Sequence, residues 1–469
     1  MILHDTERES IIAIRSSALR ISLLFFILLA SIPCPGWDQE ENVVVFLNGN
    51  NADHLKLSFH LDAVSLIDEE GKAHALAILE DEVESGEEER FQIRLISGMV
   101  RERAYGSLRM NISSPSVGRK KASLLWSGEP ITIPVNVLVS KGRIEVLFLK
   151  WDVPSSVTRK IEFKPGFVVS KPEPIVRSLK IFATDEGLGE VLVIDRHKDR
   201  VASIIKVEKE PKGLVLSPDA ERLYVANAGS GTVSVIDTLN DRIIDTISIE
   251  HGSRPVDLAI SPDGNDLYVV CNASQSVSVY NARTSSHIKE IKVGLSPEHI
   301  AMSSDGRVAY ISCKLSDEIT VIDANAKEAI SALKVSSKPM QMVVQPGKES
   351  LYVVHGASPN IVVVENRAVV KRISLGFQAK GVNFDLDGNR LFLLDPGGGR
   401  VVFFDQALES MLKFVRVKNP LNVAPDPDGK KLYVTGGSTG NLYIIDKIVG
   451  KVLSTSRIGD NVFDLVIMR

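Results

Sequence analysis

The sequence has few cysteines, little net charge and two common cofactor motifs missing. Only three of the 469 residues are cysteines, which excludes a small scaffold held together by many disulfide bonds. The net charge of −4 provides no bulk positive field of the kind that attracts nucleic acid. Neither a CxxCH nor an HExxH motif occurs, so the sequence predicts no covalently attached c-type haem and no zincin-type metal site.

One apolar run near the N-terminus is too short to be read as an ordinary membrane span. The run ISLLFFILLASIPC, Ile21 to Cys34, follows Arg15 and Arg20, whereas a spanning helix needs about 20 apolar residues. A basic flank, a short apolar run and small residues are typical of a secretory signal peptide. We therefore predict that residues 1–36 are a signal peptide cleaved after Gly36, and that the protein is exported to the periplasm or cell surface. An uncleaved N-terminal anchor is the alternative, and would be the protein's contact with a membrane.

Residues 38–168 alternate apolar and polar residues in short runs. The stretches LKLSFHL (Leu55 to Leu61) and ITIPVNVLV (Ile131 to Val139) each place every second residue on one apolar face. This period is typical of strands with one buried face, and predicts a β-sandwich of roughly immunoglobulin-like size. Residues 169–178, with Pro172 and Pro174, are predicted to be a linker, after which residues 179–469 are expected to fold independently.

From residue 179 to the end, one unit of about four strands repeats seven times. The aromatic residue that marks each copy recurs every 40 to 44 residues, at Phe182, Tyr224, Tyr268, Tyr310, Tyr352, Phe392 and Tyr433. A period of this length with four strands per copy predicts a propeller blade. We therefore predict an all-β fold with a seven-bladed β-propeller at residues 179–469.

The two ends of the repeat region complement each other. The first copy lacks an initial strand, and the chain ends in a surplus one, whose VFDLVI resembles PVDLAI of a middle copy. We predict that Asn461–Met468 fills the innermost position of the first blade. This pairing closes the ring and removes two open sheet edges.

The repeat sequence itself resembles a known family. LYVAN, SPDG and VSVID are similar to the YVTN-repeat family of seven-bladed propellers, which includes exported YncE-like and surface-layer-type proteins; lactonase-type propellers and the haem d1 domain of nitrite reductases are more distant relatives. The resemblance covers about residues 179–469, and implies export and a binding role but no chemistry. All three tryptophans, Trp37, Trp126 and Trp151, lie outside the repeats, which argues against quinoprotein, Asp-box and WD-repeat propellers.

Two sets of aligned positions are expected to surround the mouth of the central channel. The first set, at the entry of the innermost strands, is Gly213, Asp257, His299, Gln341, Gly381, Asn422 and Asp464. The second set, at the end of the aromatic strands, is Asp185, Asn227, Cys271, Cys313, His355, Asp395 and Gly436. We predict a ligand- or partner-binding site made of Asp257, His299, Gln341, His355, Asp395, Asn422 and Asp464. The alternative is local hydrogen bonding at strand ends, which we favour for Asn227.

Cys271, Cys313 and His355 occupy equivalent positions of three consecutive copies. Zinc and a disulfide are both considered, but strand spacing of about 4.8 Å and sevenfold symmetry place such positions roughly 9–10 Å apart. A disulfide needs Cα atoms within about 7 Å, and zinc needs ligands at about 2.0–2.3 Å. We therefore predict two buried thiols and no metal. The aspartates of the VID-type segments, Asp195, Asp237, Asp323 and Asp446, are predicted to form turns.

These observations favour an exported, non-enzymatic binding or scaffold protein without a cofactor. Its partner would be a protein, a glycan or a small molecule at the channel mouth. The alternative is a hydrolase or lactonase-type enzyme that uses Asp257 and Asp464 with His299. Convergence of these three side chains on one place would favour the enzyme, and dispersion around the ring would disfavour it.

Overall fold

The computed structural model describes residues 41–85, 90–118, 121–158, 161–250 and 253–469. The predicted signal peptide lies outside these ranges. Residues 41–469 form one compact unit. Within the described ranges, no helix combines the length and the apolar character needed to cross a bilayer.

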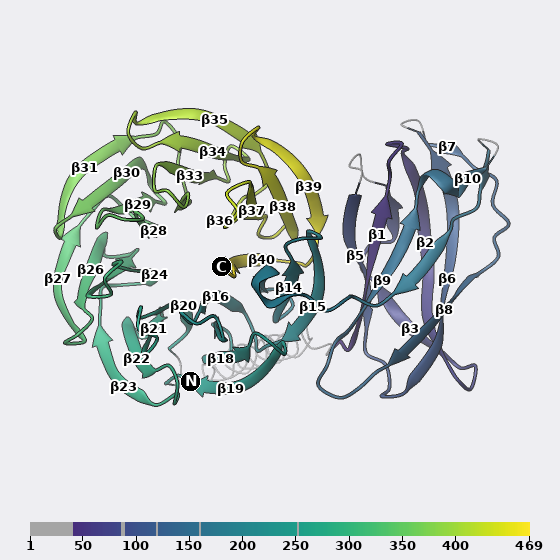
Figure 1. Cartoon of the computed structure of the whole chain (residues 1–469), viewed down its shortest axis with the longest axis horizontal. Coiled ribbons are helices and arrows are strands. Elements are labelled where there is room, and N and C mark those ends of the chain that lie inside the picture. Colours follow the sequence, from purple (N-terminus) through teal and green to yellow (C-terminus); the bar gives the residue numbers. More distant parts are fainter. Residues whose placement is uncertain (1–40, 86–89, 119–120, 159–160, 251–252) are drawn as a thin grey trace, which may run out of the picture. The chain divides into compact units, whose positions relative to one another are not determined.

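The repeat region forms a propeller-like, all-β fold (Figure 1). Six four-stranded antiparallel sheets are separate from one another, and each contains one inner, two middle and one outer strand. The first sheet consists of β40 (Val462–Ile467), β13 (Lys180–Asp185), β14 (Glu190–Asp195) and β15 (Arg200–Lys206). The second sheet consists of β16 (Pro211–Leu216), β17 (Arg222–Asn227), β18 (Thr232–Asp237) and β19 (Arg242–Ser248). The third consists of β20 (Pro255–Ile260), β21 (Asp266–Cys271), β22 (Ser276–Asn281) and β23 (His287–Lys292). The fourth consists of β24 (Pro297–Met302), β25 (Val308–Cys313), β26 (Glu318–Asp323) and β27 (Glu328–Lys334). The fifth consists of β28 (Pro339–Val344), β29 (Leu351–His355), β30 (Ser358–Glu365) and β31 (Ala368–Ser374). The sixth consists of β32 (Gly381–Phe384), β33 (Arg390–Asp395), β34 (Arg400–Asp405) and β35 (Ser410–Arg416).

The last predicted copy differs in its connections. Its strands β36 (Asn422–Pro425), β37 (Lys431–Thr435), β38 (Asn441–Asp446) and β39 (Lys451–Arg457) pair in the same antiparallel order. They also belong to a larger sheet, because Arg457 of β39 pairs with Ile93 of the N-terminal region. The inner strands β16, β20, β24, β28, β32, β36 and β40 contact one another in succession, and β40 contacts β16.

The predicted pairing of the two ends of the repeat region is confirmed. Strand β40 lies antiparallel to β13, with Phe182 opposite Val466 and Ile181 opposite Ile467. The last strand of the chain is thus the inner strand of the first sheet. Met468, which follows this strand, is also buried, so the last residues of the described chain contribute to the core.

Hydrogen bonds from three of the repeated tyrosines join a sheet to the next one. The Tyr224 hydroxyl donates to the Ala282 carbonyl at 2.7 Å, and the Tyr268 hydroxyl donates to the Ala324 carbonyl at 2.9 Å. Both carbonyls lie in turns of the following sheet. The Tyr433 hydroxyl lies 3.4 Å from the equivalent carbonyl of the first sheet, that of Arg196, and donates to a carboxylate oxygen of Asp199 at 3.0 Å.

The aspartates predicted to form turns do so. Each accepts hydrogen bonds from backbone N–H groups two and three residues further along the chain, as Asp446 does from Ile448 and Val449, both at 2.8 Å. This Asx-type arrangement holds the connection between the third and fourth strands. The same bonds are present at Asp195, Asp237 and Asp323.

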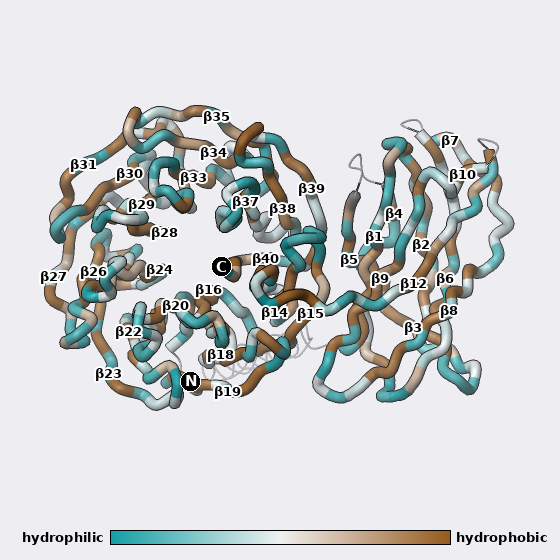
Figure 2. The backbone as a smooth tube through the Cα atoms, in the orientation of Figure 1, coloured by the Kyte–Doolittle hydropathy of each residue, from teal (hydrophilic) through white to brown (hydrophobic). Residues whose placement is uncertain are grey.

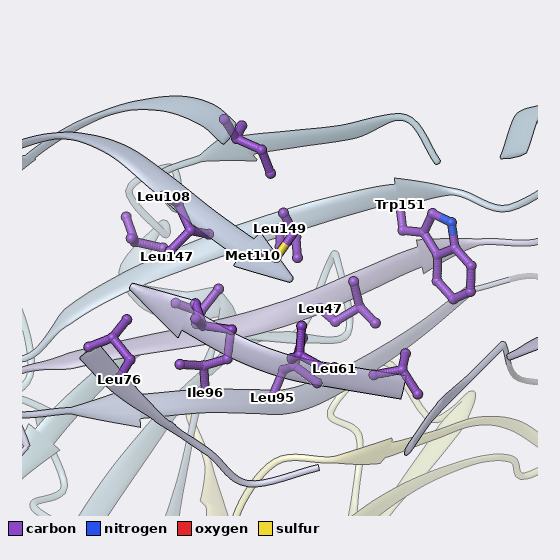
Figure 3. Close-up of a cluster of buried hydrophobic side chains, with 14 of the residues drawn as sticks. Leu47, Leu61, Leu76, Leu95, Ile96, Leu108, Met110, Leu147, Leu149 and Trp151 are labelled. Carbon is purple, nitrogen blue, oxygen red and sulfur yellow. The ribbon is translucent and has the colours of Figure 1, made fainter. Parts of the chain in front are cut away.

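The N-terminal region consists of two hydrogen-bonded layers around one core. The first contains β12 (Phe167–Ser170), β9 (Glu145–Asp152), β1 (Val43–Asn50) and β5 (Arg90–Gly98), and the second contains β8 (Ile131–Leu138), β6 (Ala104–Val117), β2 (Leu57–Asp68), β4 (Glu82–Glu84) and β7 (Ala122–Ser123), with β3 (Ala73–Ile78) pairing to both. Short elements are η1 (Pro154–Ser156), β10 (Val157–Thr158), β11 (Glu162–Phe163) and η2 (Arg177–Leu179). Figure 3 shows Leu47, Leu108, Leu149 and Trp151 between these strands. Strand β12 extends two residues into the predicted linker.

A buried ion pair connects the N-terminal region to the repeats. The Arg94 guanidinium lies 2.7 Å from a Glu190 carboxylate oxygen of β14 and 2.8 Å from one of Glu41. Burial lowers the pKa of Arg94, but the Glu190 and Glu41 carboxylates outweigh it and raise that pKa, so the guanidinium stays charged. Val44 and Phe46 of β1 also share a hydrophobic cluster with β13 and β14. The repeats therefore do not pack separately from the N-terminal region.

We predict that deleting Asn461–Met468 together with Arg469 leaves an aggregated or strongly destabilised protein, because β13 loses its partner and becomes an open edge. Removing Arg469 alone, which is exposed, is the control. Thermal melting and size-exclusion chromatography measure the difference. A long truncation that melts with the wild type would contradict the role of β40.

We predict that Arg94→Ala lowers the free energy of unfolding by about 3–5 kcal/mol, because it leaves the Glu190 carboxylate buried without its partner. Lys334→Ala, which removes a surface pair with Glu318, should cost no more than about 1 kcal/mol. Urea denaturation compares the two variants. Equal small losses would show that the N-terminal region contributes little to the stability of the repeats.

Candidate functional site

The first predicted set of positions lies on the seven inner strands and is called the axial ring here. It consists of Gly213, Asp257, His299, Gln341, Gly381, Asn422 and Asp464. In β20 and β24 the strand register shifts between the initial proline and the ring residue, Asp257 or His299. Such bulges redirect side chains. The five ring residues with side chains are all half-buried, so each retains some surface that a ligand can reach.

Three axial-ring side chains hold the next inner strand. A carboxylate oxygen of Asp257 accepts from the Ile300 N–H at 2.9 Å, and Gln341 Oε1 accepts from the Val382 N–H at 2.8 Å. Asp464 Oδ2 accepts from the Leu214 N–H at 3.3 Å. These three residues therefore have a structural role, because they join neighbouring sheets at the centre of the ring.

The remaining ring members fit around these bonds. Asn422 donates a side-chain hydrogen bond to Asp464. A Cβ atom on Gly213 would lie 2.5 Å from Asp257 Oδ1 and 2.8 Å from its Cα. Glycine is required at 213 because Asp257 occupies the space of a side chain. The two carboxylates of Asp257 and Asp464 therefore flank a ring position that has no side chain.

Burial raises the pKa values of the two aspartates, Asp257 and Asp464, into the neutral range. It raises the pKa of Asp257 to about 7. Burial, and next the charge of Asp257, raise the pKa of Asp464 to about 8, against backbone hydrogen bonds that favour the ionised form. The two groups therefore exchange protons with solvent in the neutral range rather than at acid pH.

His299 differs from the other ring side chains. Its Nδ1 is buried and has no hydrogen-bond partner among the described residues, while its Nε2 lies 3.7 Å from Asp257 Oδ2, beyond hydrogen-bond distance. The side chain is 26% exposed, against 14% for Asp257. Burial lowers the pKa of His299 to about 4, so the imidazole is neutral at pH 7. A neutral imidazole can both donate and accept.

The second predicted set lies in the interior. Asp185, Asn227, Cys271, Cys313, His355 and Asp395 are buried. His355 Nδ1 lies 3.1 Å from the Asn360 carbonyl, and Asp395 accepts from the Gly398 N–H and the Arg400 Nε–H, both at 2.8 Å. A ligand at the channel would reach neither residue without rearrangement of its strand end, although both belong to the predicted binding set. Asn227 donates to the hydroxyl groups of Thr232 and Ser234, whereas its buried Oδ1 has no hydrogen-bond partner among the described residues.

Cys271 and Cys313 are free and buried, as predicted. Each thiol lies near the hydroxyl group seven residues on, with Cys271 Sγ 3.7 Å from Ser278 Oγ and Cys313 Sγ 3.4 Å from Thr320 Oγ1. Burial raises the pKa of both thiols, so they are poor nucleophiles. No group of three or more His, Cys, Asp or Glu side chains in the described part of the chain could hold a metal ion.

Two serines deserve comparison with catalytic patterns. Ser312 lies opposite His299 in the ladder between β24 and β25, and its hydroxyl has no partner among the described residues, but the residue is fully buried. The segment Gly436–Gly440 reads GGSTG and fits the GxSxG pattern, which sequence reasoning missed. A nucleophile elbow lies between a strand and a helix, whereas Ser438 lies between β37 and β38. Ser312 is therefore not accessible to a substrate, and Ser438 does not lie in a nucleophile elbow.

Comparison with known proteins supports the propeller-like fold. No protein-family model and no curated protein sequence matches the chain. The structure is similar to a Kuenenia stuttgartiensis hydrazine synthase chain, with 20% identity, a TM-score of 0.53, and coverage of 59% of this chain and 94% of that one. It is also similar to a functionally unknown protein from Desulfotomaculum acetoxidans (14% identity, TM-score 0.56, 62% and 99% covered). A third similar structure is the dihydro-heme d1 dehydrogenase NirN (14% identity, TM-score 0.50, 64% and 77% covered). At these identities the likeness concerns the fold alone.

We predict that stability falls between pH 5 and pH 9 through Asp257 and Asp464. Both carboxyl groups have a higher pKa in the folded than in the unfolded state, so their contribution is fully present below about pH 4 and is lost as pH rises through about 7 to 8. Asp257→Asn should reduce the decrease by roughly 1–3 kcal/mol. Asp305→Asn, a surface turn carboxyl, is the control, and urea melts at the two pH values are the measurement. An unchanged pH dependence in Asp257→Asn would rule out this titration.

Proposed function

We propose that β36 to β39 form a seventh blade and that the N-terminal region is a β-sandwich. The closed succession of inner-strand contacts supports the seventh blade. The contact of the Tyr433 hydroxyl with the Arg196 carbonyl of the first sheet also supports it, because it repeats the bonds of Tyr224 and Tyr268 to carbonyls of the next sheet. The two layers of β1 and β2, with one core between them, support the sandwich.

We further propose membership of the YVTN-repeat family and export to the periplasm or cell surface. Support comes from the LYVAN, SPDG and VSVID segments and from the basic flank and apolar run at Arg15 to Cys34. N-terminal sequencing of protein recovered from the native envelope tests cleavage after Gly36. Intact protein found only in the cytoplasm would overturn this proposal.

We propose that the protein is a non-enzymatic binding or scaffold protein, and that the axial ring contacts its ligand. The carrying observation is His299, a partly exposed imidazole that makes no hydrogen bond among the described residues, in a ring whose other side chains hold neighbouring strands. Next to it are Asp257 and, around the ring in the other direction, Gln341. This set of donors and acceptors suits a polar group of a small molecule, a glycan or an inserted protein loop.

A hydrolase or lactonase-type enzyme is the second candidate. It is favoured by one observation: Asp257, Asp464 and His299 lie on one side of the ring, and the carboxyl pKa values of about 7 and 8 suit general acid–base catalysis. Against it, both carboxylates already hold backbone N–H groups, which explains them without catalysis. The binding role therefore stands first.

We predict that His299→Ala weakens ligand binding at least tenfold while the melting temperature stays within a few degrees. The screen uses thermal shift with glycan and small-molecule libraries, followed by calorimetry on each hit. His287→Ala, a histidine on the outer strand β23, is the matched control and should bind as the wild type does.

The result distinguishes three roles of His299. Equal affinity in His299→Ala for every hit would exclude the axial ring as the site. A loss of stability of about 1–3 kcal/mol with unchanged affinity would indicate a structural role. Turnover of an ester or lactone that Asp257→Asn abolishes, with binding retained, would favour the enzyme.

A further inference from the structure

Two neighbouring turns of the propeller expose a group of large apolar side chains, which we call the apolar rim. It consists of Leu408, Met411 and Leu412, after β34 and in β35, and Ile448 and Val449, between β38 and β39. Leu408, Ile448 and Val449 are 71%, 72% and 69% exposed. Figure 2 shows hydrophobic residues along β35 in this region. Isolated exposed apolar residues are ordinary, but a cluster of five requires an explanation.

The apolar rim is held in place by hydrogen bonds. Asp405 accepts from the Leu408 N–H at 2.9 Å, and Asp446 accepts from the N–H groups of Ile448 and Val449 at 2.8 Å. Lys413 of β35 donates to the Ile448 carbonyl at 2.6 Å, which ties the two turns together. The apolar side chains are therefore displayed on preformed, adjacent turns, so little conformational entropy is lost when they bind.

Charges of both signs lie around the rim, and two of its lysines have no carboxylate partner among the described residues. Lys447 and Lys451 flank Ile448 and Val449 in the sequence, and neither has an ion pair in the described part of the chain. The nearby carboxylates are engaged: Asp405 and Asp446 hold the turns, and Glu409 pairs with Lys371. An approaching surface therefore meets apolar side chains with ammonium groups beside them.

We propose that the apolar rim docks on an anionic lipid surface. Apolar side chains on turn tips can enter the boundary between headgroups and acyl chains, while flanking lysines extend to anionic headgroups. Leu408, Ile448 and Val449 lie on exposed turns, and Met411 and Leu412 lie on the exposed outer strand β35. An exposed apolar surface of this kind suits a deformable lipid surface better than a peptide ligand, since peptide recognition generally uses grooves or sheet edges. This surface is separate from the axial ring, and does not depend on the ligand proposed there.

Vesicle flotation tests the proposal with protein that begins at Trp37. This form omits the apolar run at Ile21 to Cys34, which would itself bind lipid, and retains the compact unit 41–469. The vesicles contain phosphatidylcholine alone or with 30% phosphatidylglycerol added, at low and at high salt. The variants are Ile448→Asp with Val449→Asp, and Lys447→Glu with Lys451→Glu. Leu315→Asp, at a leucine of 67% exposure between β25 and β26, is the matched control.

We expect the wild type and Leu315→Asp to float with anionic vesicles, and high salt to release them. Both double variants should reduce the bound fraction at least tenfold while keeping the wild-type melting temperature. No binding of the wild type to anionic vesicles would overturn the proposal, as would an equal loss in Leu315→Asp. A protein partner that crosslinks at Val449, with no vesicle binding, would assign the rim to that partner instead.

Discussion

The fold depends on the packing of each sheet against its two neighbours. A four-stranded sheet with two apolar faces cannot bury both faces alone, so each sheet needs a neighbour on either side. Packing of apolar faces is not directional, and polar groups at two places add direction between some of the sheets. Near the turns it is the hydroxyl of Tyr224, Tyr268 or Tyr433 on a carbonyl of the next sheet. At the centre it is a side-chain oxygen of Asp257, Gln341 or Asp464 on an N–H group of the next inner strand.

The axial ring contains side chains that hydrogen-bond to a neighbouring strand and one side chain, His299, that has no such bond among the described residues. Asp257, Gln341 and Asp464 each use an oxygen to hold an adjoining strand. A ligand that contacts them would therefore act on the joints between sheets as well as on side chains. His299 has no such bond among the described residues, and offers an imidazole whose stability contribution and binding capacity are separable.

The arrangement of the repeats followed from the sequence because it depends on local patterns. The interval between Tyr224 and Tyr268 and the turn aspartates report structure that is local in the sequence. The pairing of the strand at Val462 joins distant residues, but the repeat itself indicates it, because one copy lacks an inner strand and the last copy has one to spare. Burial at strand ends was not predictable in the same way: His355 and Asp395 align with polar positions but lie in the interior. The contact of Arg94 with Glu190 joins residues 96 positions apart, and no periodicity indicates such a pair.

The acid pair links the structural role of the axial ring to the binding role that we propose for it. Asp257 and Asp464 both accept backbone N–H bonds, which favour the carboxylate, while burial favours the neutral acid. The balance between these effects places both pKa values near neutrality, where a small electrostatic change shifts the proton. A ligand that brings a cation or a strong hydrogen-bond donor stabilises the ionised form and strengthens the same bonds to Ile300 and Leu214. In this proposal, ligand binding at the ring is coupled to the release of protons from the two aspartates. It is also coupled to the strength of the hydrogen bonds between neighbouring sheets.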